Sequence, residues 1–221
     1  MTLDTLLYNG EFHSMDDTNS IYEAMGIKDG RISFLGKDEE ARGMKVKEKI
    51  DMKGKLILPG FVDTHLHALD YAETKKFIKL NGSKSVDEVI ERSKKHYQEH
   101  GLCQGWLIGW GWNQSEFKDG NDFIYKKNLD KISKDYPIIL LRVCAHVAVV
   151  NSKAMELIMK NEISEEAMEY IDIEKGTLRE SSITVYRKTL EKPTVDYIKE
   201  MILMAQEDFL KEGITQVHSA D

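Results

Sequence analysis

The stretch LILPGFVDTHLH, residues 56–67, decides the fold of this chain. Its first three residues form a short apolar run that predicts a buried strand, and Pro59-Gly60 predicts the turn that enters it. The strand then ends in a His-x-His pair. Because residues i and i+2 of a strand point to the same side, the imidazoles of His65 and His67 can face one point in space. Two neutral imidazoles make half of a metal site. The alternative is one core histidine and one surface histidine.

The composition is typical of a soluble globular protein with one or two domains. Of the 221 residues, 41% are hydrophobic and 31% are charged, so a sizeable core is available. The net charge of -7 and the lack of a Lys/Arg cluster interleaved with aromatics argue against nucleic acid or an anionic membrane as partners. No apolar run approaches the roughly 20 residues of a membrane span, and the N-terminus does not resemble a signal peptide. We therefore expect a cytoplasmic protein in which Cys103 and Cys144 are free thiols.

Residues 1–55 look like a separate β-rich unit. Short apolar runs alternate there with turn residues, and Asp29-Gly30 between two such runs is a strong hairpin signal. A charged helical or irregular piece covers 38–49, and a last short strand at 55–58 leads into the His-x-His stretch. We assign residues 1–55 to a small β-sandwich-like domain and residues 56–221 to a second domain.

Strand and helix signals alternate in this second domain. Ser85 and Glu88 form a capping box that predicts a helix ending at Gly101. The continuous apolar run 137–143 predicts a strand buried on both faces, the kind found in parallel sheets. Further signals are a helix begun by Asn151, a longer helix capped by Thr194 and a strand at 214–217. The pattern predicts an α/β fold of the (β/α)8-barrel type. Because a complete barrel takes about 250 residues, we expect only its N-terminal part, an incomplete barrel.

Several motifs together resemble those of the amidohydrolase superfamily of metal-dependent hydrolases. They are DTHLH at 63–67, GWGWNQ at 109–114, RVCAH at 142–146 with NSKA at 151–154, GTLRE at 176–180 and GITQVH at 213–218. The pattern is similar to that of the branch containing N-substituted formamide deformylase and exoenzyme regulatory proteins. This resemblance implies a β-sandwich built from both chain ends, a metal-bearing barrel between them, and metal-ligand positions at His65, His67 and Glu180. Two further histidine ligands and an Asp that acts on the water belong to later strands of the family pattern, for which this chain has no matching residue.

Four further residues are candidates for a substrate pocket. Trp112 and Asn113 lie in a glycine-rich loop that can line the mouth of a pocket, although tryptophans also simply pack in cores. His146 follows a buried strand, where barrel active sites collect, although a core histidine bonded to backbone explains it equally well. His218 follows the last strand and is a pocket candidate only.

We therefore expect a metal-dependent hydrolase that acts on a non-peptide C–N bond of a small-molecule substrate, in an amide, formamide or cyclic amide. One or two divalent ions, Zn²⁺ by preference, would bring the pKa of a bound water to about 7 and polarise the carbonyl. The general-base Asp lies outside this chain, so the chain alone is expected to be inactive. A deaminase shares the fold and the metal, and a non-catalytic regulatory or binding protein would keep the fold without the chemistry. An incomplete barrel leaves the strand at 214–217 with an open edge, through which we expect self-association.

Overall fold

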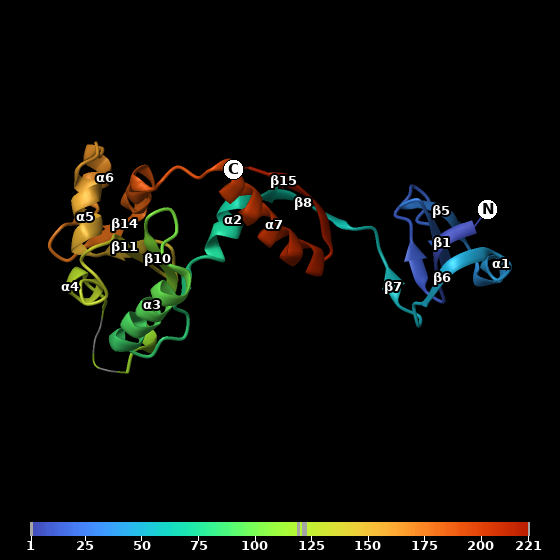
Figure 1. Cartoon of the computed structure of the whole chain (residues 1–221), viewed down its shortest axis with the longest axis horizontal. Helices are drawn as coiled ribbons and strands as arrows, with labels where there is room; N and C mark the ends of the chain where they lie inside the picture. Colours follow the sequence, from blue (N-terminus) through green and yellow to red (C-terminus); the bar gives the residue numbers. More distant parts are fainter. Residues whose placement is uncertain (1, 119, 121–122, 221) are drawn as a thin grey trace. The chain divides into compact units, whose positions relative to one another are not determined.

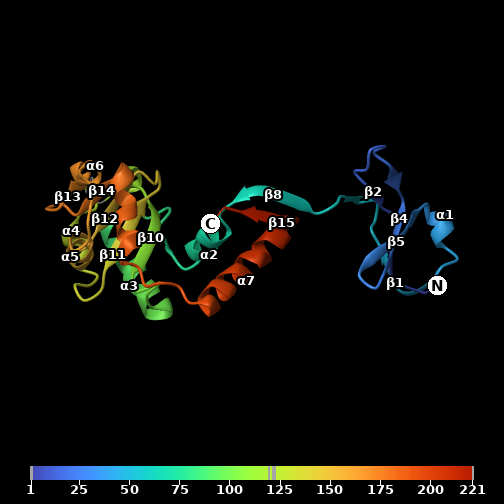
Figure 2. The ribbon, with the colours of Figure 1, turned by 90° about the horizontal axis from the view of Figure 1, so that it is seen from above.

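The computed structural model describes residues 2–118, 120 and 123–220 and divides into two compact units (Figures 1 and 2). The first unit contains the described residues up to Leu66 together with Phe209–His218, and the second contains His67–Asp208 and the last residues described. The division falls after Leu66, whereas the predicted domain boundary lies after residue 55. In the part of the chain that is described, no helix is both long and apolar enough to cross a membrane.

The first unit is built mainly from two small sheets. A four-stranded sheet has the order β5-β4-β1-β6, and a three-stranded sheet has the order β3-β2-β7. The strands are β1 (Thr2–Tyr8), β2 (Glu11–His13), β3 (Ile21–Tyr22), β4 (Ala24–Lys28), β5 (Arg31–Gly36), β6 (Lys45–Asp51) and β7 (Leu56–Ile57), with helix α1 (Asp38–Ala41). Asp29 and Gly30 join β4 to β5 with φ values of 51° and 72°, the left-handed pair that a tight hairpin turn requires, so the predicted hairpin is confirmed.

Strands β8 (Phe61–Leu66) and β15 (Ile214–Ser219) form a two-stranded sheet. The backbone N–H of Phe61 donates to the carbonyl of Gly213 at 2.8 Å. Gly60 permits this close approach, because a Cβ atom at that position would lie 2.2 Å from Oγ1 of Thr215. The structure has no turn at Pro59-Gly60, so the predicted turn is wrong, and Gly60 serves instead the pairing of β8 with β15.

The second unit contains a six-stranded mixed sheet with the order β13-β14-β12-β11-β10-β9. Its strands are β9 (Ile78–Lys79), β10 (Leu107–Trp112), β11 (Ile138–Arg142), β12 (Val147–Val150), β13 (Ile171–Asp172) and β14 (Thr177–Arg179). Strands β9, β10 and β11 are parallel, whereas β12, β14 and β13 continue the sheet antiparallel. The α/β class is therefore as predicted, but the sheet is not wholly parallel, because a turn with Ala145 at φ 60° sends β12 back along β11. The incomplete barrel and the β-sandwich stay predictions.

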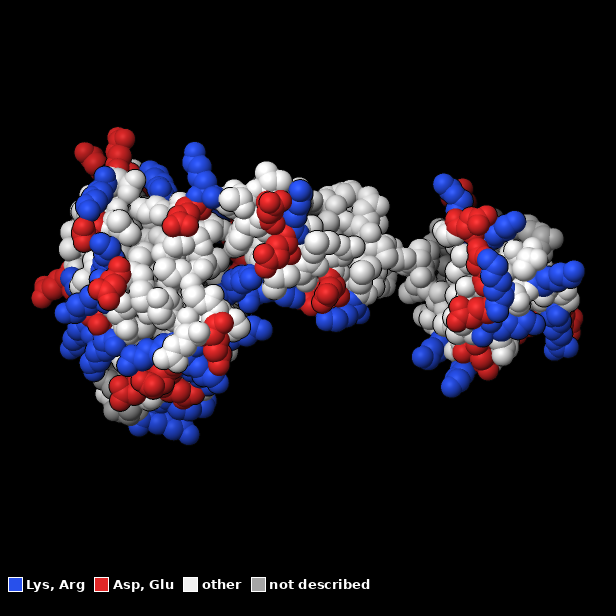
Figure 3. Space-filling view, viewed as in Figure 1, with Lys and Arg blue, Asp and Glu red and all other residues white. Residues whose placement is uncertain are grey.

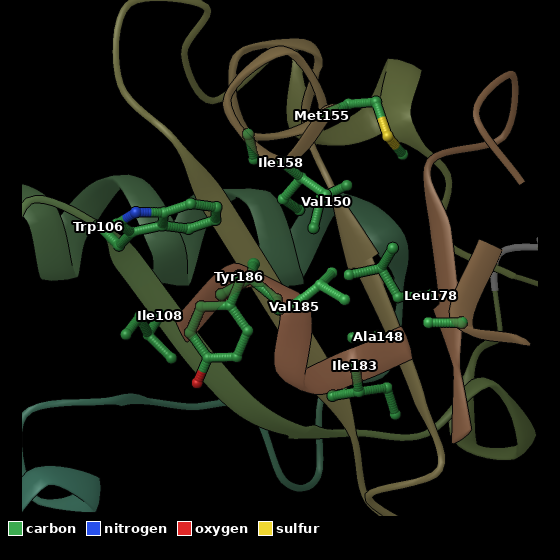
Figure 4. Close-up of a cluster of buried hydrophobic side chains, with 13 residues drawn as sticks. Trp106, Ile108, Ala148, Val150, Met155, Ile158, Leu178, Ile183, Val185 and Tyr186 are labelled. Atoms are coloured by element: carbon green, nitrogen blue, oxygen red, sulfur yellow. The ribbon is translucent and has the colours of Figure 1, made fainter. Parts of the chain in front are cut away.

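Helices cover both faces of this sheet. The helices of the chain from α2 onward are α2 (Ala68–Thr74), α3 (Val86–His100), α4 (Lys126–Leu129), α5 (Ser152–Met159), α6 (Glu165–Glu169) and α7 (Val195–Lys211), with 3₁₀ segments η1 (Gln114–Glu116) and η2 (Glu180–Thr189). On one face, α5, α6 and η2 bury side chains against the sheet, and Figure 4 shows Trp106 and Tyr186 in this cluster, with ring centroids 5.5 Å apart. On the other face, α3 and α4 complete a second apolar cluster.

The predicted helix boundaries of α3 are confirmed. The Ser85 hydroxyl accepts from the backbone N–H of Glu88 at 3.0 Å, and Gly101 ends the helix at φ 71°. The Glu88 carboxylate, however, accepts from the backbone N–H of Lys84 at 2.7 Å rather than from that of Ser85. Helix α7 begins in a similar way, because Thr194 Oγ1 accepts from the N–H of Tyr197 at 3.2 Å.

One buried amide joins three segments of the second unit. Asn151 is completely buried, and its Oδ1 accepts from the backbone N–H groups of Ala154 and Ile138 at 2.9 and 3.1 Å. Its Nδ2 donates to the carbonyls of Ser133 and Tyr136, both at 2.9 Å. Asn151 thus caps α5 as predicted and also fixes the start of β11 and the loop that precedes it.

We predict that Asn151→Ala lowers the free energy of unfolding by about 3 kcal/mol or more, because the helix cap is lost and buried backbone groups lose their partners. Urea unfolding followed by the fluorescence of the buried tryptophans of this unit measures the change. The matched control is Asn161→Ala, whose exposed amide makes one bond to the Leu157 carbonyl, and we expect it to cost less than about 0.5 kcal/mol. Equal effects of the two substitutions would contradict the assigned role of Asn151.

Candidate metal centre

The two histidines of the His-x-His motif lie at the end of strand β8. His65 is in the strand, and its backbone N–H donates to Oδ1 of Asp63 at 3.0 Å. His67 follows the strand and is the N-cap residue of α2, with φ -94° and ψ 85°. Both histidines are exposed. A strand therefore leads into the histidines as predicted, but it ends one residue before His67 and is largely exposed rather than buried. The apolar run that begins at Leu56 forms the separate short strand β7.

A further histidine, His218, lies on strand β15. Strand β15 pairs with β8, and His218 is exposed. Its Nε2 lies 3.2 Å from Nε2 of Gln216, two residues earlier on the same strand. As a pocket residue His218 stays a prediction.

His146 and Glu180 form an ion pair between the ends of two neighbouring strands. Nδ1 of His146 lies 2.9 Å from Oε2 of Glu180, and the backbone N–H of Glu180 donates to the His146 carbonyl at 3.2 Å. His146 directly precedes β12 and Glu180 directly follows β14, two strands that pair antiparallel. Ala145 and Glu180 have φ values of 60° and 44°, a backbone region that residues other than glycine adopt uncommonly and that clusters at functional sites. The fold therefore holds this pair in a strained but defined geometry.

The pair is solvent-exposed, and its charge affects the imidazole. The side chains of His146 and Glu180 are 68% and 54% exposed. The hydrogen bond to Glu180 and the negative charge of this carboxylate raise the pKa of His146 above its usual value. His146 is thus neither buried nor bonded to a backbone partner through its ring, so the core-histidine alternative is not what the structure shows. Its ring instead forms an ion pair with the carboxylate of Glu180, the residue that the sequence analysis predicts as a metal ligand.

A polar network lies at the carboxyl ends of β10 and β11, and of its members only Asn113 was a candidate from the sequence. Nε of Arg142 donates to Oε1 of Gln114 at 2.7 Å, and its Nη2 lies 3.5 Å from Oδ1 of Asn113. The Asn113 oxygen also accepts from the backbone N–H of Ser115 at 3.2 Å, as the cap of η1. Arg142 and Gln114 could have been found from their position in the sequence. Polar residues at the carboxyl ends of neighbouring parallel strands meet at one edge of a sheet.

Cys144 lies in the same turn as His146 and is half-buried. Burial raises the pKa of the Cys144 thiol, but hydrogen bonds from the backbone N–H of His146 and from the Arg142 side chain outweigh it, so the pKa lies below the usual value for cysteine. The turn between β11 and β12 therefore favours negative charge at Cys144 and positive charge at His146.

Trp112 does not lie at the mouth of a pocket. Its side chain is completely buried, and Nε1 donates to the Leu140 carbonyl at 3.0 Å. The pairing of β10 with β11 shifts register between Trp110 and Trp112, where Gly111 has φ 101°. This bulge turns Trp112 into the core and leaves Trp110 43% exposed. The packing alternative for Trp112 is therefore the correct one.

A sequence profile of the amidohydrolase family matches residues 48–221, a range that includes the His-x-His strand and the His146–Glu180 pair. The chain belongs to the amidohydrolase family. This match confirms the resemblance inferred from the sequence motifs.

Relatives of known sequence and structure agree with this assignment. The chain is 28% identical over 229 residues to YtcJ of Bacillus subtilis (strain 168), covering 99% of this chain and 43% of that protein. It is 26% identical over 159 residues to N-substituted formamide deformylase of Arthrobacter pascens, covering 70% of this chain and 29% of that enzyme. The crystal structure of an uncharacterized metal-dependent hydrolase from Pyrococcus furiosus aligns with a TM-score of 0.72 and 30% identity, covering 96% of this chain and 43% of that one. The chain spans less than half the length of these amidohydrolase relatives.

The three predicted metal ligands of this amidohydrolase chain have the donor chemistry that a divalent metal accepts. Two exposed imidazoles, His65 and His67, and one carboxylate, Glu180, are the nitrogen and oxygen donors that Zn²⁺ accepts. Within residues 2–118, 120 and 123–220, no three His, Cys, Asp or Glu side chains gather in an arrangement that holds a metal ion. The described residues therefore supply ligand types without a complete ligand set.

We predict that His146 titrates in NMR spectra with a pKa above the usual histidine value, and that Glu180→Gln lowers it. Because the folded-state pKa is raised, the pair stabilises the fold at pH values below the unfolded-state pKa, and this stabilisation is lost as the pH rises through the folded-state pKa. The control is Glu174→Gln, which removes an exposed carboxylate shortly before β14. A pKa of His146 that both variants leave unchanged would disprove the ion pair.

Proposed function

We propose that this chain forms part of a metal-dependent amidohydrolase that hydrolyses non-peptide C–N bonds of small molecules. The observation that carries the proposal is the His-x-His pair at the end of strand β8, inside the region of the family match. The name of one relative, N-substituted formamide deformylase, supports a substrate with a C–N bond to a carbonyl carbon. Amides, formamides and cyclic amides are the substrate classes that fit this chemistry.

In this proposal His65, His67 and Glu180 bind one or two divalent ions, Zn²⁺ by preference. A bound ion would polarise the substrate carbonyl and make a water molecule acidic enough to attack it near neutral pH. The chain's own contribution is to hold the ligands: Asp63 fixes the backbone at His65, and His146 orients the Glu180 carboxylate.

The proposal assigns substrate contacts to Asn113, His146 and His218. Asn113 and His146 lie at the ends of strands, where polar side chains can reach a ligand. The general-base Asp would come from the part of the relatives' length that this chain does not span, so the chain alone would turn over little or no substrate. A cytoplasmic location fits the two cysteines, which the structure shows as free thiols.

We predict that His65→Ala/His67→Ala strongly weakens Zn²⁺ binding by the chain, because two of its nitrogen donors are removed. Competition with a chromophoric chelator measures the affinity. The matched control is His96→Ala/His100→Ala, which removes two histidines of α3 whose ring centroids are 4.8 Å apart. Glu180→Gln, which keeps the shape of the side chain, should weaken binding less than the double variant does.

Two outcomes would contradict the metal assignment. Zinc affinity that is unchanged in the His65/His67 variant would remove the His-x-His pair from the site. Loss of zinc only in the His96/His100 variant would move the site to helix α3. Far-UV circular dichroism of each variant establishes that the fold is retained.

The proposal extends to self-association through the sheet of β8 and β15. A two-stranded sheet has unpaired edges, and β8 exposes apolar side chains, with Phe61 55% and Val62 47% exposed. We predict that the mean mass in sedimentation velocity rises with protein concentration. Gln216→Lys places a charge on exposed β15 and should reduce the effect, whereas Gln98→Lys on exposed α3 should not. A monomer at every concentration would contradict the prediction.

A further inference from the structure

The first unit contains a cavity that takes no part in the proposed metal site. It has a volume of about 440 Å³ and lies between strand β1, helix α1 and strand β6. This volume falls in the range of about 300–1,000 Å³ that is typical of small-molecule sites. The surrounding residues include an apolar group and two cations, which come from different elements.

The apolar part of the cavity comes from residues that also form the core of this unit. Leu6 of β1 and Ala41 of α1 are 2% and 1% exposed, and both belong to the buried cluster of the unit. Tyr8, two residues after Leu6 on the same strand, is half-buried beside them. Because Leu6 and Ala41 are almost completely buried, Tyr8 is the apolar lining residue whose side chain stays accessible to a ligand.

Two cations, Arg42 and Lys49, also line the cavity. Lys49 of β6 pairs in register with Leu6 of β1, and because paired residues place their side chains on the same face of a sheet, Lys49 lies on the core-facing side. Arg42 follows Ala41 at the end of α1. Both line the cavity, both are exposed, and neither makes an ion pair or side-chain hydrogen bond with any described residue.

The remaining polar groups of the cavity already have partners. Oδ1 of Asp38 accepts from the backbone N–H of Asn9 at 3.0 Å, and Nδ2 of Asn9 donates to Asp51 at 2.7 Å. Elsewhere on this unit Lys and Arg side chains lie among Asp and Glu side chains (Figure 3), as in the pair of Lys47 with Asp4 at 2.6 Å. The lining thus holds two cations, Arg42 and Lys49, and one carboxylate, Asp38, so it keeps a net positive charge.

We propose that this cavity binds a small organic carboxylate with an apolar body. The carboxylate would accept from the guanidinium of Arg42, which presents paired donors, and from the ammonium of Lys49. The apolar body would contact the half-buried side chain of Tyr8. The residues that line the cavity are not among those assigned to the proposed hydrolase site, so we propose a ligand distinct from the hydrolase substrate.

Fluorine NMR of the whole chain tests this site, with para-fluorobenzoate as the anionic probe and para-fluorobenzamide as its neutral counterpart. We expect the benzoate to bind, the benzamide to bind at least about tenfold more weakly, and added salt to weaken the benzoate only. Arg42→Met and Lys49→Met keep the length of the side chains and should each weaken the benzoate about tenfold.

The control for these variants is Lys45→Met, which removes an exposed lysine of the same strand that does not line the cavity. It should leave the affinity unchanged. Equal binding of the benzoate and the benzamide, no binding of either, or equal weakening by all three substitutions would each overturn the proposal. Unchanged far-UV circular dichroism distinguishes loss of the site from loss of the fold.

Discussion

The geometry of the second unit depends on satisfying buried backbone groups where β11 begins and β12 ends. The completely buried Asn151 does this with four hydrogen bonds, which tie the first N–H of β11 to the first turn of α5 and to the preceding loop. With that end fixed, the opposite ends of β11 and β12 are joined by the tight turn that carries Arg142 and His146. Asn151 therefore helps to determine where the candidate site lies, although it takes no part in the chemistry of that site.

The sequence was sufficient wherever a local interaction determines the structure. Ser85 and Thr194 begin helices because their hydroxyls accept from backbone N–H groups three residues on, a relation that the sequence spacing contains. Asp29-Gly30 closes its hairpin because both residues tolerate positive φ. The strand before the His-x-His pair was also predicted, although it begins at Phe61, after the apolar run that forms β7. The assignment of Glu180 as a metal ligand came instead from the family resemblance and stays a prediction.

The sequence was insufficient where contacts between distant segments determine the local structure. Strand β6 has the sequence KVKEKID and was expected to be helical or irregular, but parallel pairing with β1 makes it a strand despite its charges. The apolar run of β12 was missed as a strand, and with it the reversal at Ala145 that makes the sheet mixed. Trp112 was placed at a pocket because the bulge at Gly111, which turns it inward, depends on pairing with β11. The contacts of Arg142 with Gln114 and Asn113 likewise bridge two strands.

The pairing of Glu180 with His146 does not conflict with the proposed metal-binding role of this carboxylate. The reason is the difference in strength between an exposed ion pair and a metal–ligand bond. An ion pair as exposed as this one contributes little to stability, because water competes for both partners. A complete structural zinc site in a small peptide contributes about 10–16 kcal/mol, so one ligand's share exceeds the strength of the pair. His146 would therefore yield the carboxylate to a divalent ion at small cost. In the absence of an ion, the same contact keeps Glu180 oriented and balances its charge at a position where the backbone is already strained. A weak partner next to the proposed ligand Glu180 would thus prepare the site without blocking it.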